Sequence, residues 1–296
     1  MSHDQTFKNL ILDYPREALA FFAAPEGEAI PPDARIIPVR QEQLQERLGE
    51  RFRELDTPLL VEWPDGRHEA ILFVVEEETK PRRFSIHRLI HYCVDLAELF
   101  NTDRVVPVVI FLHRGDFPTA LRLGGDRGVY LDFRFLYSVL AELPAVRYQT
   151  SDNIVARLNL LNMSYPRERK VALYAAAQEG LASLEPDPEK RLKYGDFIEL
   201  YGALTDDDIV VYERDYLPQS PHREVIMGYA QYLREQGIDQ GIHMGLQRVV
   251  RRLLIERFGP LPESIETRLT NASAEQLDAW SFNLLKARTL DEVFAE

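Results

Sequence analysis

Cysteine is almost absent from this chain of 296 residues, because Cys93 is the only one. A single cysteine excludes an internal disulfide and a metal site built from several thiolates. Long apolar runs are also absent: the longest, such as VVPVVIFL at 105–112, are too short and too rich in β-branched residues to cross a bilayer. The first residues lack a basic segment leading into a continuous apolar stretch, so they predict a helix and not a signal peptide. We expect a cytoplasmic protein without membrane contact.

Cations are scarce in the chain. It has 35 Lys and Arg residues against 48 Asp and Glu residues, which gives a net charge of −13 at pH 7. This balance argues against a large non-specific nucleic-acid surface, because such binding depends on neutralising phosphates with Lys and Arg. A local basic groove beside an acidic metal site remains compatible with it. Metal-dependent nucleases use that combination, since the divalent ion bridges carboxylates to phosphate.

The N-terminal half has the pattern of an α/β core. Asp65 and Gly66 separate two β-rich runs, which predicts a hairpin that turns at these two residues. The run VVPVVIFLH is continuously apolar, as expected of a strand buried on both faces. The predicted elements are a helix over 3–23 broken at Pro15, a strand at 36–39, a polar helix at 41–52, strands at 59–63 and 70–75, a helix at 84–100 and a strand at 105–113.

The C-terminal half is predicted to be helical. Glycines near 124–128 form no phosphate-loop spacing and predict a plain loop. The tail has clear helix signals, since Gly259 precedes a proline, Ser273 and Gln276 have the spacing of a capping box, and Thr289 precedes a helix start. Helical segments are expected near 132–142, 151–162, 166–183, 189–203 and 221–258. The predicted division of the chain is a core at 1–145, a helical extension and connector at 146–246, and a small helical domain at 247–296.

Three acidic residues end the second strand of the predicted hairpin. With the period of two that a strand has, Glu76 and Glu78 share one face, and Lys80 continues that face if the strand persists. Carboxylates are hard oxygen ligands that suit Mg²⁺, so this end of the strand is a candidate metal site. The alternative is a solvated strand end that discourages edge-to-edge association.

Asp56, on the first strand of the hairpin, is the candidate for a second acidic ligand. A turn at Asp65 and Gly66 places Asp56 opposite Val75, next to Glu76 but on the other face of the sheet. A one-residue bulge near Pro58 would bring the two acids to the same face. The sequence therefore permits the pair without establishing it.

Three stretches carry a family resemblance: HDQTFKNL at the start, Asp56 upstream of VVEEE, and FSIHRLIHY at 84–92. Together they resemble the Rpn-type recombination-promoting nuclease and putative transposase family, which belongs to the PD-(D/E)XK phosphodiesterases. Its members typically show an Asp on one strand, Glu-x-Gln or Glu-x-Lys on the next, and then a helix with a Phe…Arg…Tyr pattern. The tail RRLLIERFGPLPESIETRL looks like a helical domain of unknown function that is often attached to such nucleases.

The resemblance implies a PD-(D/E)XK restriction-endonuclease-like core, with a central mixed sheet flanked by helices, and a Mg²⁺-dependent DNA endonuclease activity. Asp56 and Glu76 match the metal-binding acids, and Phe84, Arg88 and Tyr92 match the helix pattern. Arg88, which the family pattern supports, and Arg82 could contact the phosphate backbone at the entrance to the helix. The alternative, which is favoured for Arg82, is that they form salt bridges with Glu77 and Glu78.

The chain departs from the family at Glu78, which stands where members have Gln or Lys. A third carboxylate adds repulsion to an anionic transition state, so Lys80 could supply the missing cation. Equally, the fold could be a catalytically degenerate nuclease that serves as a protein-interaction module. Both hypotheses stay open at this point.

Three weaker candidates complete the sequence reading. His87 and His91 lie one helical turn apart but lack the partner glutamate of a zinc motif, so an exposed polar face is the simpler interpretation. Cys93, on the apolar side of its helix, predicts an inert thiol. Glycines at 237, 241 and 245 form a small-residue stripe that suggests a close helix contact, such as one in a homodimer.

Overall fold

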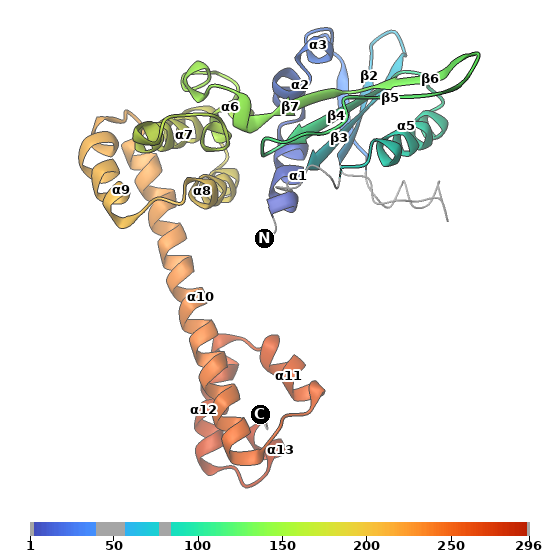
Figure 1. The fold of residues 1–296 in the computed structure, drawn as a ribbon. Helices are drawn as coiled ribbons and strands as arrows, with labels where there is room; N and C mark the ends of the chain where they lie inside the picture. Colours follow the sequence, from blue (N-terminus) through green and yellow to red (C-terminus); the bar gives the residue numbers. More distant parts are fainter. Residues whose placement is uncertain (1–2, 40–56, 77–83, 295–296) are drawn as a thin grey trace. The chain divides into compact units, whose positions relative to one another are not determined.

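The computed structural model describes residues 3–39, 57–76 and 84–294 (Figure 1). The chain divides into two compact units, Met1–Ile226 and Met227–Glu296, and each is considered separately below. The polar helix expected at 41–52 lies outside the described residues. The finer division at 145 and 246 stays a prediction.

A five-stranded mixed sheet forms the centre of the first unit, in the order β1-β2-β3-β4-β7. Strand β2 is antiparallel to both β1 and β3. Helix α5 connects β3 to β4, which is parallel to β3, and β7 is parallel to β4. The mixed α/β class is therefore confirmed. The bounds are β1 Arg35–Pro38, β2 Thr57–Glu62, β3 His68–Glu76, α5 Ile86–Phe100, β4 Val105–Phe111 and β7 Leu136–Val139.

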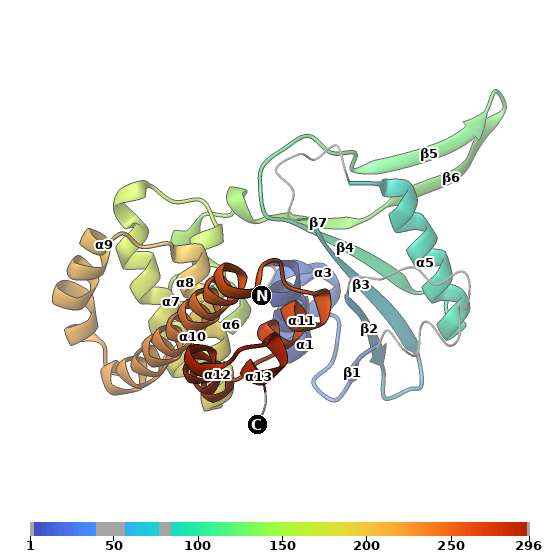
Figure 2. The same ribbon diagram turned by 90° about the horizontal axis from the view of Figure 1, so that it is seen from below.

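Helices cover both faces of this sheet, with α5 on one side and the N-terminal helices on the other (Figure 2). The predicted break at Pro15 is confirmed: α1 (His3–Asp13) ends before it and α2 (Pro15–Phe22) begins with it, because proline suits the first turn of a helix but not its interior. A short helix, α3 (Ala24–Gly27), follows. The central strand β4 is buried from Pro107 to Phe111, as its continuous apolar run predicts.

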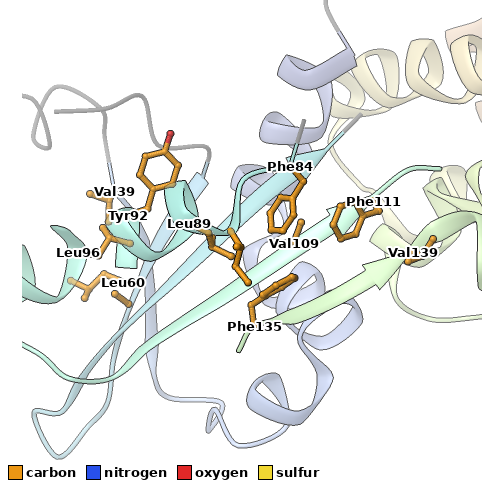
Figure 3. Close-up of a cluster of buried hydrophobic side chains, with 12 residues drawn as sticks. Val39, Leu60, Phe84, Leu89, Tyr92, Leu96, Val109, Phe111, Phe135 and Val139 are labelled. Atoms are coloured by element: carbon orange, nitrogen blue, oxygen red, sulfur yellow. The ribbon is translucent and has the colours of Figure 1, made fainter. Parts of the chain in front are cut away.

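The core between the sheet and α5 is rich in aromatic rings. Phe84, Phe111 and Phe135 lie together at one end of this core, while Tyr92 and Leu96 of α5 cover the other end (Figure 3). Apolar residues recur along α5 at the spacing of one helical face, so burying that face holds the helix on the sheet.

The hairpin between β2 and β3 differs from the prediction by one residue. Its turn contains three residues, since the amide of Trp63 donates to the carbonyl of Arg67 (2.9 Å) and the amide of Gly66 donates to the carbonyl of Trp63 (2.9 Å). Pro64 explains the shift, because its fixed φ suits the first central position of a turn, and Gly66 then adopts a φ of +83° as the third loop residue. A two-residue turn at Asp65 and Gly66 was therefore the wrong prediction.

This change of turn alters which residues of the two strands face each other. Thr57 pairs with Phe73, Pro58 with Leu72 and Glu62 with His68, so even-numbered residues pair with even-numbered ones. Directly opposed residues of an antiparallel pair share a face, and a shift of one residue exchanges the faces. The register predicted for the described part of the hairpin is therefore off by one residue, and Asp56, predicted to face Val75, lies outside the described residues.

The helix predicted near 132–142 is also wrong. Residues 128–139 form β6 (Gly128–Arg134) and β7, and only Leu140–Glu142 turns helically, as a short 3₁₀ segment. The sequence held the correct signal, since Val129, Leu131, Phe133 and Phe135 alternate with other residues at the period of a strand. Strand β5 (Ala120–Gly125) pairs with β6 in a separate two-stranded sheet, where a plain loop was expected around the glycines.

The rest of the first unit is helical, as predicted. Several of these helices begin with a side-chain cap: Asn153 caps α6, Asp187 caps α8 and Thr205 caps α9. Lys193 and Tyr194 of α8 bond to Asp13 of α1, with distances of 2.6 and 2.7 Å, which ties this helical part to the N-terminal helices. The bounds are α6 Ile154–Leu158, α7 Lys170–Leu184, α8 Pro188–Gly202 and α9 Asp206–Val211.

The second unit has its own apolar core, centred on Leu254, Leu277 and Trp280. Its predicted helix signals are confirmed: Gly259 ends α10 with a φ of +82°, Ser273 and Gln276 form a capping box, and the Thr289 side chain caps the last helix. Helix α10 (Arg223–Phe258) begins in the first unit, and α11 (Glu263–Thr270), α12 (Ala274–Lys286) and α13 (Leu290–Val293) follow. Among the described residues, no helix combines the length and apolar composition needed to cross a membrane.

Candidate functional site

The candidate site lies where β3 and β4 end. Glu76 is the last residue of β3 and pairs with Phe111, the last residue of β4. Because β3, α5 and β4 form a parallel crossover, the N-terminus of α5 lies at the same end of the sheet as these two strand ends. Such an end, outside the carboxyl termini of parallel strands, is where open α/β sheets bind ligands.

The N-terminus of α5 is capped by Ser85. Its hydroxyl accepts a hydrogen bond from the amide of Arg88 at 3.3 Å, which satisfies one of the free donors of the first turn. Amide groups at a helix start also favour a nearby anion. The Arg88 side chain lies on the exposed side of this first turn, so a cation and a helix N-terminus occur together at this end of the sheet.

An aromatic cluster lies beside the strand ends. Phe84 meets Phe111 edge to face, with ring centroids 5.5 Å apart, and Phe111 stacks on Phe117 at 3.7 Å. Phe84 is only 7% exposed and also packs against Phe135. The Phe…Arg…Tyr pattern therefore separates into two buried rings, Phe84 and Tyr92, and one exposed cation, Arg88.

Most of the predicted site residues lie outside the described residues. These are Asp56, Glu78, Lys80 and Arg82. The structure places Glu76, as the end of β3, and Arg88, in the first turn of α5, at the same end of the sheet. Within residues 3–39, 57–76 and 84–294, no group of three or more His, Cys, Asp or Glu side chains is arranged to hold a metal ion. The proposed ligand pair includes Asp56 and is thus left to experiment.

The other candidates on α5 behave as ordinary helix residues. His87 and His91 are both exposed, in line with a solvated polar face. Cys93 is half-buried, and burial raises the pKa of its thiol to about 12. A thiol with such a pKa is almost entirely protonated at neutral pH, which agrees with the predicted inert cysteine.

One buried acid of the sheet was not singled out from the sequence. Glu69 is 2% exposed, and its carboxylate pairs with the guanidinium of Arg104, which precedes β4. The sequence offered little signal for it, because Glu69 follows Arg67 and His68 and stands just before the apolar run of β3, where an exposed acid is usual. The pair lies at the opposite end of β3 from Glu76 and joins β3 to the start of β4, so its role is structural.

A second polar cluster in the helical part superficially resembles a hydrolase triad. Ser220 and His222 both bond to Glu179, with His222 Nδ1 at 2.5 Å. The Ser220 hydroxyl accepts from the backbone amide of His222 and makes no bond to its ring in this cluster. The base is therefore not placed to deprotonate the hydroxyl, and the cluster holds the start of α10.

Comparisons with known proteins identify no relative, since no family model, no curated protein and no solved structure matches this chain.

Proposed function

We propose that this protein is a metal-dependent DNA endonuclease-like enzyme that hydrolyses phosphodiester bonds, as the resemblance to the Rpn-type family implies. The observation that carries the proposal is that Glu76 ends β3 at the same end of the sheet as Arg88 and the capped start of α5. In the described part of the hairpin, the register differs by one residue from the one that set Asp56 and Glu76 on opposite faces, and Asp56 itself lies outside the described residues.

In the described part of the hairpin, Pro58 pairs with Leu72 and Leu60 with Ala70, so even-numbered residues of β2 share a face with even-numbered residues of β3. Glu76 is an even-numbered residue and pairs with Phe111, whose ring belongs to the core under α5. For the proposed site to form, Asp56, which lies outside the described residues, has to reach Glu76 at the end of β3, where α5 also starts.

Residues at this position have distinct proposed roles. Asp56 and Glu76 hold Mg²⁺ or another divalent cation, which supplies an activated water and offsets phosphate charge. Glu78 or Lys80 orients the attacking water. Arg88, exposed beside the capped helix start, contacts a phosphate of the substrate, and Arg82 contacts another.

Plasmid nicking tests the proposal. With Mg²⁺ or Mn²⁺, Glu76→Gln should lower the nicking rate about a hundredfold or more, because the substitution keeps the size of the side chain and removes the ligand charge. Glu62→Gln is the matched control, since Glu62 is an acid of the same hairpin at its other end, opposite His68. The control should nick at the wild-type rate. Equal nicking by wild type and Glu76→Gln would reject the assignment.

Glu78 motivates a second candidate, a nuclease fold that has lost catalysis and acts as a protein-interaction module. A carboxylate in place of Gln or Lys opposes an anionic transition state. Absence of nicking and of metal binding in the wild-type protein, together with a stable partner detected by light scattering of the purified complex, would favour this candidate.

A further inference from the structure

The hairpin formed by β5 and β6, hereafter the arm (Ala120–Arg134), is a two-stranded sheet separate from the main sheet. Figure 2 shows it extending past the end of the main sheet. All of its residues are at least partly exposed, and Tyr130, near the tip, is 81% exposed. An isolated two-stranded hairpin is marginally stable in water and gains little from an apolar core, so such an arm is expected to have a binding partner.

The base of the arm packs against the core of the first unit. Leu121 of β5 and Phe133 of β6 pack against the same core that contains Phe84 and Phe111. Phe111 in turn pairs with Glu76 across β3 and β4. Beyond Phe135, the base of the arm continues into β7, where Leu136 pairs with Val108 and Val139 with Phe111.

One face of the arm carries a cationic group. In this group, the Asp132 carboxylate accepts hydrogen bonds from Arg122 at 2.9 Å and from Arg134 at 3.4 Å. Both guanidinium groups stay exposed, 61% for Arg122 and 71% for Arg134, so their remaining donors face solvent. Asp132 orients these two cations and leaves the group with a net positive charge.

The charge balance of the arm is opposite to that of the whole chain. Arg122, Arg127 and Arg134 outnumber Asp126 and Asp132, whereas the chain as a whole has a net charge of −13. The arm therefore has a net charge of +1, with three arginines and an exposed tyrosine. Arginines bind phosphates, and aromatic rings stack on bases, which makes nucleic acid the matching partner.

The tip of the arm combines a β-bulge with a close approach of its two strands. The pairing shifts between Leu123 and Gly124, leaving Tyr130 as the extra residue of a bulge. A Cβ on Gly124 would lie 2.3 Å from the carbonyl oxygen of Gly128, so the close approach of the strands requires glycine there. A bulge and charged side chains discourage a hairpin from pairing with the edge of a second copy, whereas a two-stranded ribbon fits the major groove of duplex DNA.

We propose that the arm is a duplex-DNA-binding ribbon that enters the major groove. The proposal takes the nature of the ligand from the proposed nuclease function. It assigns binding to residues that play no part in the metal site, so the two ideas can fail separately.

The test is binding of the full-length protein to a fluorescein-labelled duplex oligonucleotide, with Ca²⁺ present to prevent cleavage, followed by fluorescence anisotropy. The variant is Arg127→Gln with Tyr130→Ser, which changes two exposed residues at the tip and keeps the cationic group around Asp132. Its matched control is Arg252→Gln with Phe282→Ser, which removes the same charge and another exposed aromatic ring in the second unit.

The tip variant should raise the dissociation constant about tenfold and reduce the slope of log K against log salt by about one, while the control changes affinity less than about twofold. Wild-type affinity in the tip variant would overturn the assignment of the arm and leave the nuclease proposal standing. A tip variant that changes only the oligomeric mass would overturn it in favour of a second copy, and absence of duplex binding by the wild type would also overturn it.

Discussion

Single residues determine features of this structure that extend over whole strands. Pro64 sets the turn between β2 and β3 and thereby fixes which residues of the hairpin share a face. Glu69, although charged, is buried because Arg104 accompanies it. Each of these residues can be seen in the sequence. The effect of each depends on its neighbours in the folded protein, which a periodic sequence pattern does not identify.

Asp13 gives a prediction at the residue scale. Burial tends to raise the pKa of its carboxyl, but hydrogen bonds from Lys193 and Tyr194 outweigh burial and hold this pKa below the ordinary value of 3.8. A carboxyl whose pKa is lowered by folding contributes stability above its unfolded pKa, and this contribution is lost as pH falls through the lower, folded value.

Asp13→Asn should therefore lower the free energy of unfolding. The loss should be constant around neutral pH and should become smaller below about pH 3.8. Urea unfolding at a series of pH values measures this difference. The exposed Asp278→Asn serves as the control and should show no such trend. A difference between wild type and Asp13→Asn that grows on acidification would contradict the role given to Asp13.

At the scale of elements, strong periodicity and end signals were reliable guides. The helix at 84–100, the strand at 105–113 and the capped helices of the tail were predicted because each pattern repeats over many residues or has a specific cap. The arm was missed because Gly124, Gly125 and Gly128 are usual loop residues. Their role in a close pairing of strands depends on a partner strand that the local sequence does not identify.

The capping box of α12 supplies a prediction at this scale. Ser273 Oγ accepts from the amide of Gln276 at 3.2 Å, and Gln276 Oε1 accepts from the amide of Ser273 at 2.9 Å. Ser273→Ala should lower the free energy of unfolding of the second unit by about 1 kcal/mol. Ser281→Ala, in the interior of the same helix, should change it by less than about 0.5 kcal/mol. Equal effects in thermal unfolding would contradict the importance of the cap.

At the scale of the whole molecule, the class of fold was predictable and the chemistry less so. A mixed α/β sheet with a helical second half follows from the order of apolar runs along the chain. The candidate site depends on one residue of register between two strands, a quantity that turn geometry sets and that composition does not reveal. Glu76 and Arg88 come to one end of the sheet, as expected of a strand end and a following helix start.

The central claim is that Asp56 and Glu76 hold one divalent cation between them, and Mn²⁺ titration monitored by electron paramagnetic resonance tests it most directly. Asp56→Asn and Glu76→Gln should each abolish the tightest binding, and the double variant should lose no more than either single variant, because two ligands of one ion act as a unit. Glu62→Gln should bind Mn²⁺ as the wild type does. Unchanged binding in either single variant, or losses that add in the double variant, would contradict the shared site.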